Sequence, residues 1–176
     1  MPHIMLATGD LAMDREDYDE SFVATRDVLR AADVTFGQLE TSFASTGTRL
    51  PQARHAVLAR PEGAAALGRA GFDVISMAGN HCMDWGREAF FETRAHLEAA
   101  GIAVVGAGAN IAEARRPVIR TLGDGTRLAV LAYSSILPHS YWADERRPGC
   151  APMRAHTVYE QIEHDQPGTP ARIHTF

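Results

Sequence analysis

The chain has 176 residues, of which 45% are hydrophobic, and its formal net charge is -5. A chain of this length can bury a core of its own, and we expect one domain. The 17 basic residues are dispersed and are all arginine, which argues against a nucleic-acid partner and excludes mechanisms that need a lysine, such as a P-loop or a Schiff base.

The sequence contains no apolar run long enough to span a membrane, and its first residues lack the basic region of a signal peptide. We therefore expect a cytoplasmic protein. The two cysteines, Cys82 and Cys150, are far apart and form no CxxC motif, so neither a disulfide framework nor a zinc ribbon is indicated.

Strand and helix patterns alternate from the start of the chain. Residues 3–8 suit a first buried strand, residues 21–31 a helix with an apolar stripe, and residues 34–39 a second strand. The segment 41–60 has no sustained period and is expected to run over the surface.

The middle of the chain continues this alternation. Pro61 opens a helix over residues 62–70, and Gly71 is a natural stop for it. The mostly apolar residues 72–77 predict a third strand that is covered on both faces. A further helix is expected over residues 88–100.

The last elements are shorter. Residues 103–105 predict a fourth strand, and the glycine-rich GAGAN after it predicts a tight turn into a short helix, because Ile111 stands where a dinucleotide fingerprint needs a small residue. Residues 118–122 and 127–133 predict a hairpin around an Asp-Gly turn. Beyond it the period is lost, and residues 138–170 are rich in Pro, Arg and His.

Strands alternating with helices predict an α/β fold with a mainly parallel sheet flanked by helices. Three successive strands end in polar residues, namely Asp10, Glu40, and Asn80 with His81. The carboxyl ends of parallel strands share one edge, so these side chains can converge on one crevice. Their donors suit a divalent metal such as Mn, Fe, Zn or Mg, which could polarise a phosphoryl or carbonyl oxygen and activate water.

Each residue also has a purely structural explanation. Asp10 can form an Asx-turn, Glu40 can be a solvated loop residue, and Asp84 can cap the following helix. His81 can be a buried structural histidine, although Asn80 and Asp84 beside it favour a functional role.

Five segments of the chain resemble, in order, the bacterial capsule synthesis CapA proteins, which are poly-gamma-glutamate capsule proteins with a metallophosphoesterase-like fold. These are GDLAMD, FGQLET with a later GTRL, GFDVISMAGNHCMDWG, LEAAGIAVVGAGANIAEARRPVI and RLAVLAYSS. The resemblance covers residues 4 to about 135 and implies half of an αββα sandwich. It suggests a CapA-like domain over residues 1–137 and, over residues 138–176, the start of a second half.

The resemblance also implies roles for single residues. Asp10, Glu40 and Asn80 would hold the metal, His81 would be the acid for the leaving group, and Asp84 is the second catalytic candidate.

The sequence departs from the family pattern in three places. Ala12 replaces the histidine of Asp-x-His, Gln38 replaces an asparagine, and the later histidine motifs of the HWG and GHHPH kind are absent from this sequence. His139 could substitute for a missing ligand.

We therefore expect a metal-dependent hydrolase in capsule or poly-gamma-glutamate synthesis, acting on a phosphate ester or a glutamate-type amide of a small molecule or polymer. The alternative is a non-catalytic fragment or binding module for an anionic polymer. A third hypothesis, a nucleotide-binding α/β domain, ranks last because only the GAGAN stretch supports it. A sheet with an exposed edge could also be covered by a second copy in a homodimer.

Overall fold

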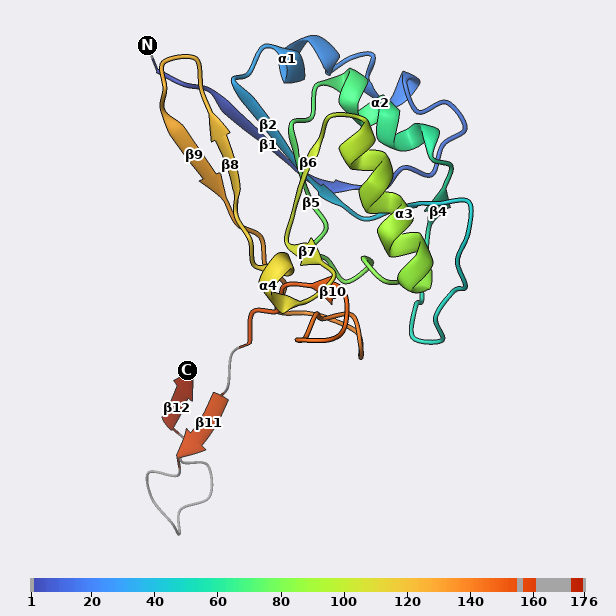
Figure 1. Cartoon of the computed structure of the whole chain (residues 1–176), viewed down its shortest axis with the longest axis vertical. Coiled ribbons are helices and arrows are strands. Elements are labelled where there is room, and N and C mark those ends of the chain that lie inside the picture. Colours follow the sequence, from blue (N-terminus) through green and yellow to red (C-terminus); the bar gives the residue numbers. More distant parts are fainter. Residues whose placement is uncertain (1, 155–156, 161–171, 176) are drawn as a thin grey trace.

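A four-stranded parallel sheet forms the centre of the computed structural model, which describes residues 2–154, 157–160 and 172–175. Its strands, in spatial order, are β1 (Met5–Leu11), β2 (Val34–Leu39), β5 (Val74–Ser76) and β6 (Ala103–Val105). Figure 1 shows helices flanking this sheet, so the predicted α/β class is confirmed.

The rest of the described chain forms helices and short strand pairs. The helices are the 3₁₀ helix η1 (Glu20–Phe22), α1 (Arg26–Arg30), α2 (Glu62–Ala70), α3 (Gly86–Ala99) and α4 (Ile111–Ala114). The paired strands are β3 (Ser42–Phe43) with β4 (Leu58–Ala59), β7 (Ala107–Gly108) with β10 (Gly149–Cys150), β8 (Val118–Thr121) with β9 (Arg127–Val130), and β11 (Thr157–Glu160) with β12 (Arg172–Thr175). Within the described ranges, none of these helices has the length and apolar character to cross a membrane.

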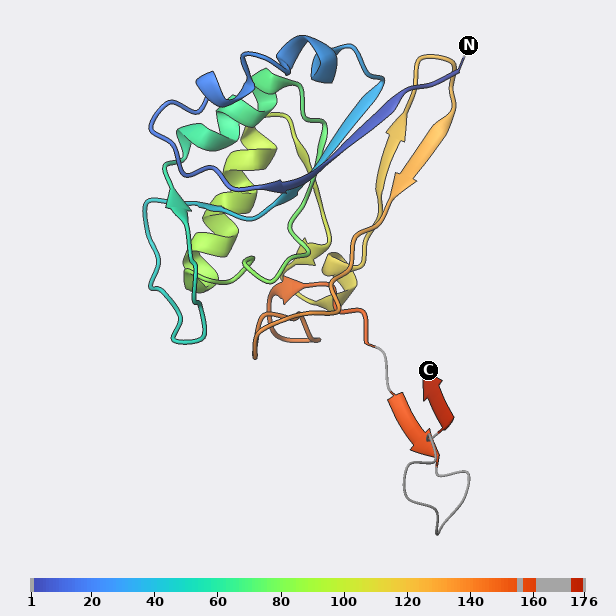
Figure 2. The ribbon, with the colours of Figure 1, turned by 180° about the vertical axis from the view of Figure 1, so that it is seen from behind.

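The sheet is covered on both faces because side chains alternate along each strand. Helices α2 and α3 pack on one face, whereas the β8–β9 hairpin packs on the other, as Figures 1 and 2 show from opposite sides. Val74 and Ile75 are neighbours in β5, belong to different hydrophobic clusters, and are both 0% exposed. The prediction that this strand is buried on both faces is confirmed.

The local signals for several elements also hold. Gly71 ends α2 with a φ of 105°, which only glycine adopts easily. The GAGAN stretch contains strand β7, which was not predicted, but the short helix expected after it is α4, and the Asn110 side chain caps that helix by accepting from Glu113 N at 3.0 Å. The predicted hairpin is β8–β9.

The first strand differs from the expectation. β1 lies at an edge of the sheet, where Met5 is 44% exposed, and it runs on through Asp10 to Leu11 with an irregularity between Ala7 and Asp10. A short apolar run does not show whether its strand is central or peripheral, so the prediction of a buried strand over residues 3–8 was wrong.

The single helix predicted over residues 21–31 is also wrong, because η1 and α1 stand in its place. Of the supposed apolar stripe, Phe22 and Leu29 are buried, whereas Val23 is 70% and Val28 is 63% exposed. β-Branched side chains in this segment lose rotamer freedom in a helix, which disfavours one continuous element.

The segment 41–60, which was expected to run over the surface, and the Pro-, Arg- and His-rich segment after residue 137 both place residues in the core. Phe43 is 0% exposed, and its backbone N–H donates to Thr93 Oγ1 of α3 at 2.9 Å. Tyr141 and Cys150, from the supposed tail, are also 0% exposed. The domain boundary at residue 137 stays a prediction, and residues 155–156, 161–171 and 176 lie outside the described residues.

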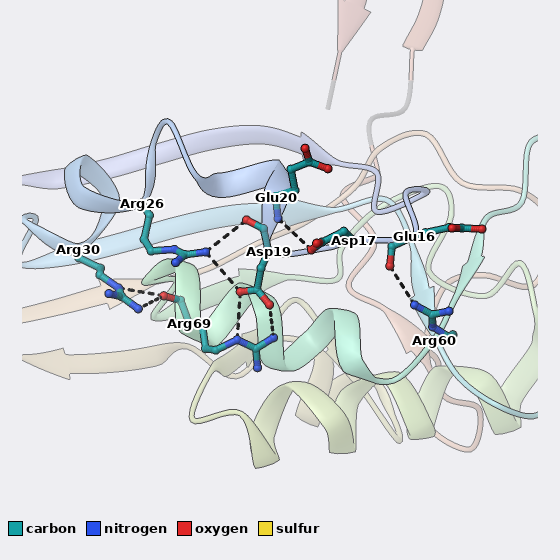
Figure 3. Close-up of polar contacts among 8 residues, drawn as sticks. All are labelled: Glu16, Asp17, Asp19, Glu20, Arg26, Arg30, Arg60 and Arg69. Carbon is teal, nitrogen blue, oxygen red and sulfur yellow. Dashed lines mark hydrogen bonds and ion pairs between the residues drawn. The ribbon is translucent and has the colours of Figure 1, made fainter.

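Charged side chains tie the segment after β1 to helices α1 and α2 (Figure 3). Arg69 of α2 donates two hydrogen bonds to the Asp19 carboxylate, at 2.6 and 3.1 Å, and Arg26 of α1 contacts the same residue. Arg60 donates to Glu16 O at 2.9 Å. Exposed pairs contribute little individually, but this network holds the chain immediately after the first strand.

A second anchor holds the long loop between β3 and β4. Glu92 of α3 accepts hydrogen bonds from Ser45 N at 2.8 Å, from Thr46 N at 3.2 Å and from Thr46 Oγ1 at 2.7 Å. These donors lower the pKa of Glu92 from 4.5 to about 2. The carboxylate therefore fixes the start of the loop on α3.

Truncation of the β5 core should be costly. Ile75→Ala should lower the free energy of unfolding by about 2–5 kcal/mol, because the cavity it leaves is enclosed on the helix side. Ile119→Ala is the matched control, since Ile119 on β8 is 43% exposed, and should cost less than about 1 kcal/mol. Denaturant unfolding measures both, and a loss below about 1 kcal/mol for Ile75→Ala would contradict its burial.

The Glu92 anchor should make stability depend on pH. Its pKa is lower when folded, so its contribution is complete above pH 4.5 and is lost as the pH falls towards about 2. Glu92→Gln should therefore cost about 1–2 kcal/mol at neutral pH, and the gap to the wild type should close in acid. Denaturant titrations across this range test it, with exposed Glu145→Gln as the control, and a gap independent of pH would refute the assignment.

Candidate functional site

The register of the sheet brings the polar residues at the ends of β1 and β2 together. Asp10 pairs with Gln38 in the parallel ladder, and Glu40 N donates to Leu11 O at 3.1 Å. Asn80 lies in the turn after β5. A hollow of about 370 Å³, here called the acidic hollow, is lined by Asp10, Gln38, Glu40, Asn80 and the segment 133–136. Three of the predicted residues therefore share one hollow.

Gly79 lets the turn after β5 approach these side chains closely. A Cβ at this position would come within 2.6 Å of Gln38 Nε2 and 3.4 Å of Glu40 Oε1. Gln38 therefore occupies space that a larger residue at position 79 would take.

His81 lies beside the acidic hollow, between two carboxylates. Its Nδ1 donates to Asp84 Oδ2 at 2.6 Å, and its Nε2 lies 3.4 Å from Glu40 Oε2. The Tyr141 hydroxyl donates to the other Asp84 oxygen, Oδ1, at 2.7 Å. The Asp84 side chain is only 3% exposed, so these two donors compensate a carboxylate that water barely reaches. They orient the imidazole with Nε2 towards Glu40.

The structure excludes one structural explanation for Asp84. The N-cap of α3 is Trp85, with no side-chain hydrogen bond to the helix end, so the capping role considered for Asp84 was wrong. Asp10 belongs to β1 itself and not to a turn after it.

The pKa values of two groups at the site are raised above their ordinary values. Burial, and then the neighbouring charge of Asp10, raise the pKa of Glu40 above its ordinary value. Burial and the hydrogen bond to Asp84 raise the pKa of Tyr141, which keeps this hydroxyl a donor. A cation bound beside the Glu40 carboxylate would offset the burial and the neighbouring charge that disfavour its ionised form.

The donors of the acidic hollow fit a hard divalent cation in type. They are the carboxylates of Asp10 and Glu40 and the amides of Gln38 and Asn80. Among the residues that the structure describes, however, no three Asp, Glu, His or Cys side chains gather closely enough to hold a metal ion. Binding here would thus depend on amide oxygens and water in addition to the two carboxylates.

The sequence did not predict the positions of two residues near the site. Tyr141 was missed, because it comes from a segment without periodicity and reaches Asp84 only through the fold. His139, considered as a substitute ligand, packs edge-on against Trp142 with ring centroids 5.6 Å apart. It is not among the residues that line the acidic hollow.

Comparison with known proteins shows similarity to one family of bacterial proteins and to several of its relatives. The family model described as bacterial capsule synthesis protein PGA_cap matches residues 4–174. An uncharacterized protein of Sinorhizobium fredii is 32% identical over 85% of this chain and 35% of its own length. A probable polyglutamine synthesis accessory protein of Mycobacterium tuberculosis is 35% identical over 68% of this chain and 32% of its own.

The capsule biosynthesis protein CapA of Bacillus anthracis is more distant, at 29% identity over 59% of this chain and 25% of its own length. The matched region thus spans between 25% and 35% of these three relatives.

The Tyr141 hydroxyl should matter for stability. Tyr141→Phe leaves a buried carboxylate oxygen without its donor and should lower the free energy of unfolding by about 1–3 kcal/mol. Tyr133→Phe removes the same group from a side chain that is 41% exposed and should cost less than about 0.5 kcal/mol. Equal losses in chemical denaturation would show that the bond to Asp84 contributes nothing of its own.

Proposed function

The chain belongs to the bacterial capsule synthesis protein family PGA_cap, and from this we propose that its strand-end site is part of a metal-dependent hydrolase. The proposed reaction is cleavage of a phosphate ester or a glutamate-type amide in capsule or poly-gamma-glutamate synthesis. The printed names of the Mycobacterium and Bacillus relatives support this setting.

The single observation that carries the proposal is His81, which is held by the buried Asp84 carboxylate and whose Nε2 lies 3.4 Å from Glu40 Oε2 of the acidic hollow. Asp84 fixes the imidazole through Nδ1, so in the imidazolium form Nε2 carries the proton that goes to the leaving oxygen or nitrogen, and the neutral ring with its proton on Nδ1 remains. Tyr141 keeps Asp84 in place from the other side. Asp84 and Tyr141 thus act as positioning residues, and His81 is the proton donor.

Asp10, Glu40 and Asn80 are the proposed ligands of a divalent metal, with Mn, Fe, Zn and Mg as candidates. When bound, such a metal supplies a Lewis acid for the phosphoryl or carbonyl oxygen. The chain's own residues orient the ligand in the acidic hollow, where burial and then the charge of Asp10 raise the pKa of Glu40, and a cation would offset both effects.

A second candidate is a non-catalytic module that binds an anionic polymer. It is favoured by the finding that no set of three Asp, Glu, His or Cys side chains suited to a metal occurs in the described part of the chain. Metal binding and turnover separate the two candidates.

Metal analysis tests the proposed ligands. We expect the wild type to bind Mn or Zn weakly and to lose it readily to chelators, and Asp10→Asn or Asn80→Ala to weaken binding about tenfold or more, since few protein ligands are available. Asp14→Asn is the matched control, because Asp14 is an exposed carboxylate of the loop after β1, and its affinity should be unchanged.

Turnover of a phosphate ester and of a γ-glutamyl amide is assayed with the same proteins. His81→Ala should abolish the slow hydrolysis without changing metal content. Metal binding insensitive to both ligand variants, or hydrolysis insensitive to His81→Ala, would contradict the hydrolase and leave the binding module.

A further inference from the structure

A second hollow adjoins the acidic hollow at Asn80. It measures about 280 Å³, and we call it the basic hollow; its polar lining comprises Gln52, Arg54, His55, Asn80, His81 and Asp84. Asn80 lines both hollows, so one extended ligand can occupy the two at once. The Asp84 carboxylate has both oxygens engaged, by His81 and Tyr141.

The outer wall of the basic hollow is a loop that is attached to the rest of the site at several points. Beyond the Glu92 anchor, Thr48 N donates to Trp85 O at 3.1 Å and Leu50 N donates to Asp84 O at 2.8 Å. Gln52 Nε2 then donates to His139 O at 2.9 Å. The position of residues 52–55 relative to His81 is therefore set by the fold.

Positive charge is concentrated on this wall. Arg49 braces the loop by donating to Ala53 O at 2.9 Å and to Arg54 O at 2.7 Å. Arg54 itself is exposed, and in the described ranges its guanidinium forms no ion pair with a carboxylate, unlike those of Arg60 and Arg69. A free guanidinium at the wall of a polar hollow offers the planar donor set that carboxylates and phosphates bind best.

We propose that the basic hollow binds an anionic group, a carboxylate or a phosphate, of a ligand whose neighbouring unit lies in the acidic hollow. Arg54 is the residue that determines this specificity. The inference rests on the proposed function for the class of ligand, a polymer with an anionic group on each unit. It adds that the site contacts at least two consecutive units of the polymer and therefore binds the polymer more tightly than a single unit.

Binding is measured by calorimetry at low ionic strength on the whole chain, which is first freed of metal on a chelating resin so that no soluble polycarboxylate chelator competes for Arg54. The probes are a γ-linked glutamate tetramer, N-acetylglutamate as the single unit, and inorganic phosphate. The wild type should bind the tetramer more tightly than the single unit. Arg54→Gln should weaken binding of the tetramer and of the single unit about tenfold each, the effect of losing one charge-assisted contact, because each ligand places an anionic group at Arg54.

Arg127→Gln is the matched control, because Arg127 is exposed and lies at the start of β9, outside the linings of both hollows. Equal weakening by Arg54→Gln and Arg127→Gln would overturn the inference, as would failure of the wild type to bind the tetramer. Unchanged denaturation midpoints verify that both variants fold.

Phosphate distinguishes the sources of the anion. Arg54-dependent binding of phosphate that displaces the tetramer supports a phosphate-bearing ligand, whereas Arg54-dependent binding of the tetramer alone supports a carboxylate-bearing one. Because the protein is metal-free throughout, these results do not depend on the metal. If the hydrolase proposal is wrong, the metal content and turnover measurements will show it. If the proposal for the basic hollow is wrong, only the binding measurements with these anionic probes will show it.

Discussion

The buried Asp84 carboxylate is the constraint on which the site depends. A charge removed from water must be compensated, and here Tyr141 and His81 provide the donors at 2.7 and 2.6 Å. The backbone oxygen of the same residue accepts from Leu50, while His81 reaches Glu40 after β2. Asp84 thus connects its own turn directly to Leu50 and Tyr141 and, through His81, to Glu40. The hydrogen bonds that compensate its buried charge therefore set the relative positions of these segments.

Near Asp84, acidic and basic side chains lie on opposite sides of the site. The ends of β1 and β2 bring carboxylates to one side of Asn80, whereas the loop after β3 brings Arg54 and His55 to the other. A parallel sheet makes the first arrangement simple, because its strands end at a common edge. The second arrangement depends on loop attachments to α3 and to the turn after β5, which have no counterpart in sheet geometry.

The sequence predicted the parallel sheet, α2, α3 and the hairpin, because each has a strong local signal such as a sustained period, Pro61, Gly71 or an Asp-Gly turn. The gathering of Asp10, Glu40 and Asn80 followed from the same logic of strand ends. Tyr141 and Phe43 could not be predicted, because each belongs to a short segment whose burial depends only on distant partners. The metal-binding and catalytic roles stay predictions.

The attachments of the loop between β3 and β4 have an optical consequence. Thr48 is bound to the carbonyl of Trp85, and Gln52 to the carbonyl of His139, whose ring packs against Trp142. Both tryptophans of the chain therefore adjoin a contact that holds this loop in place. Detachment of the loop would change the environment of both indoles, so the protein carries an intrinsic fluorescence reporter of the wall beside His81.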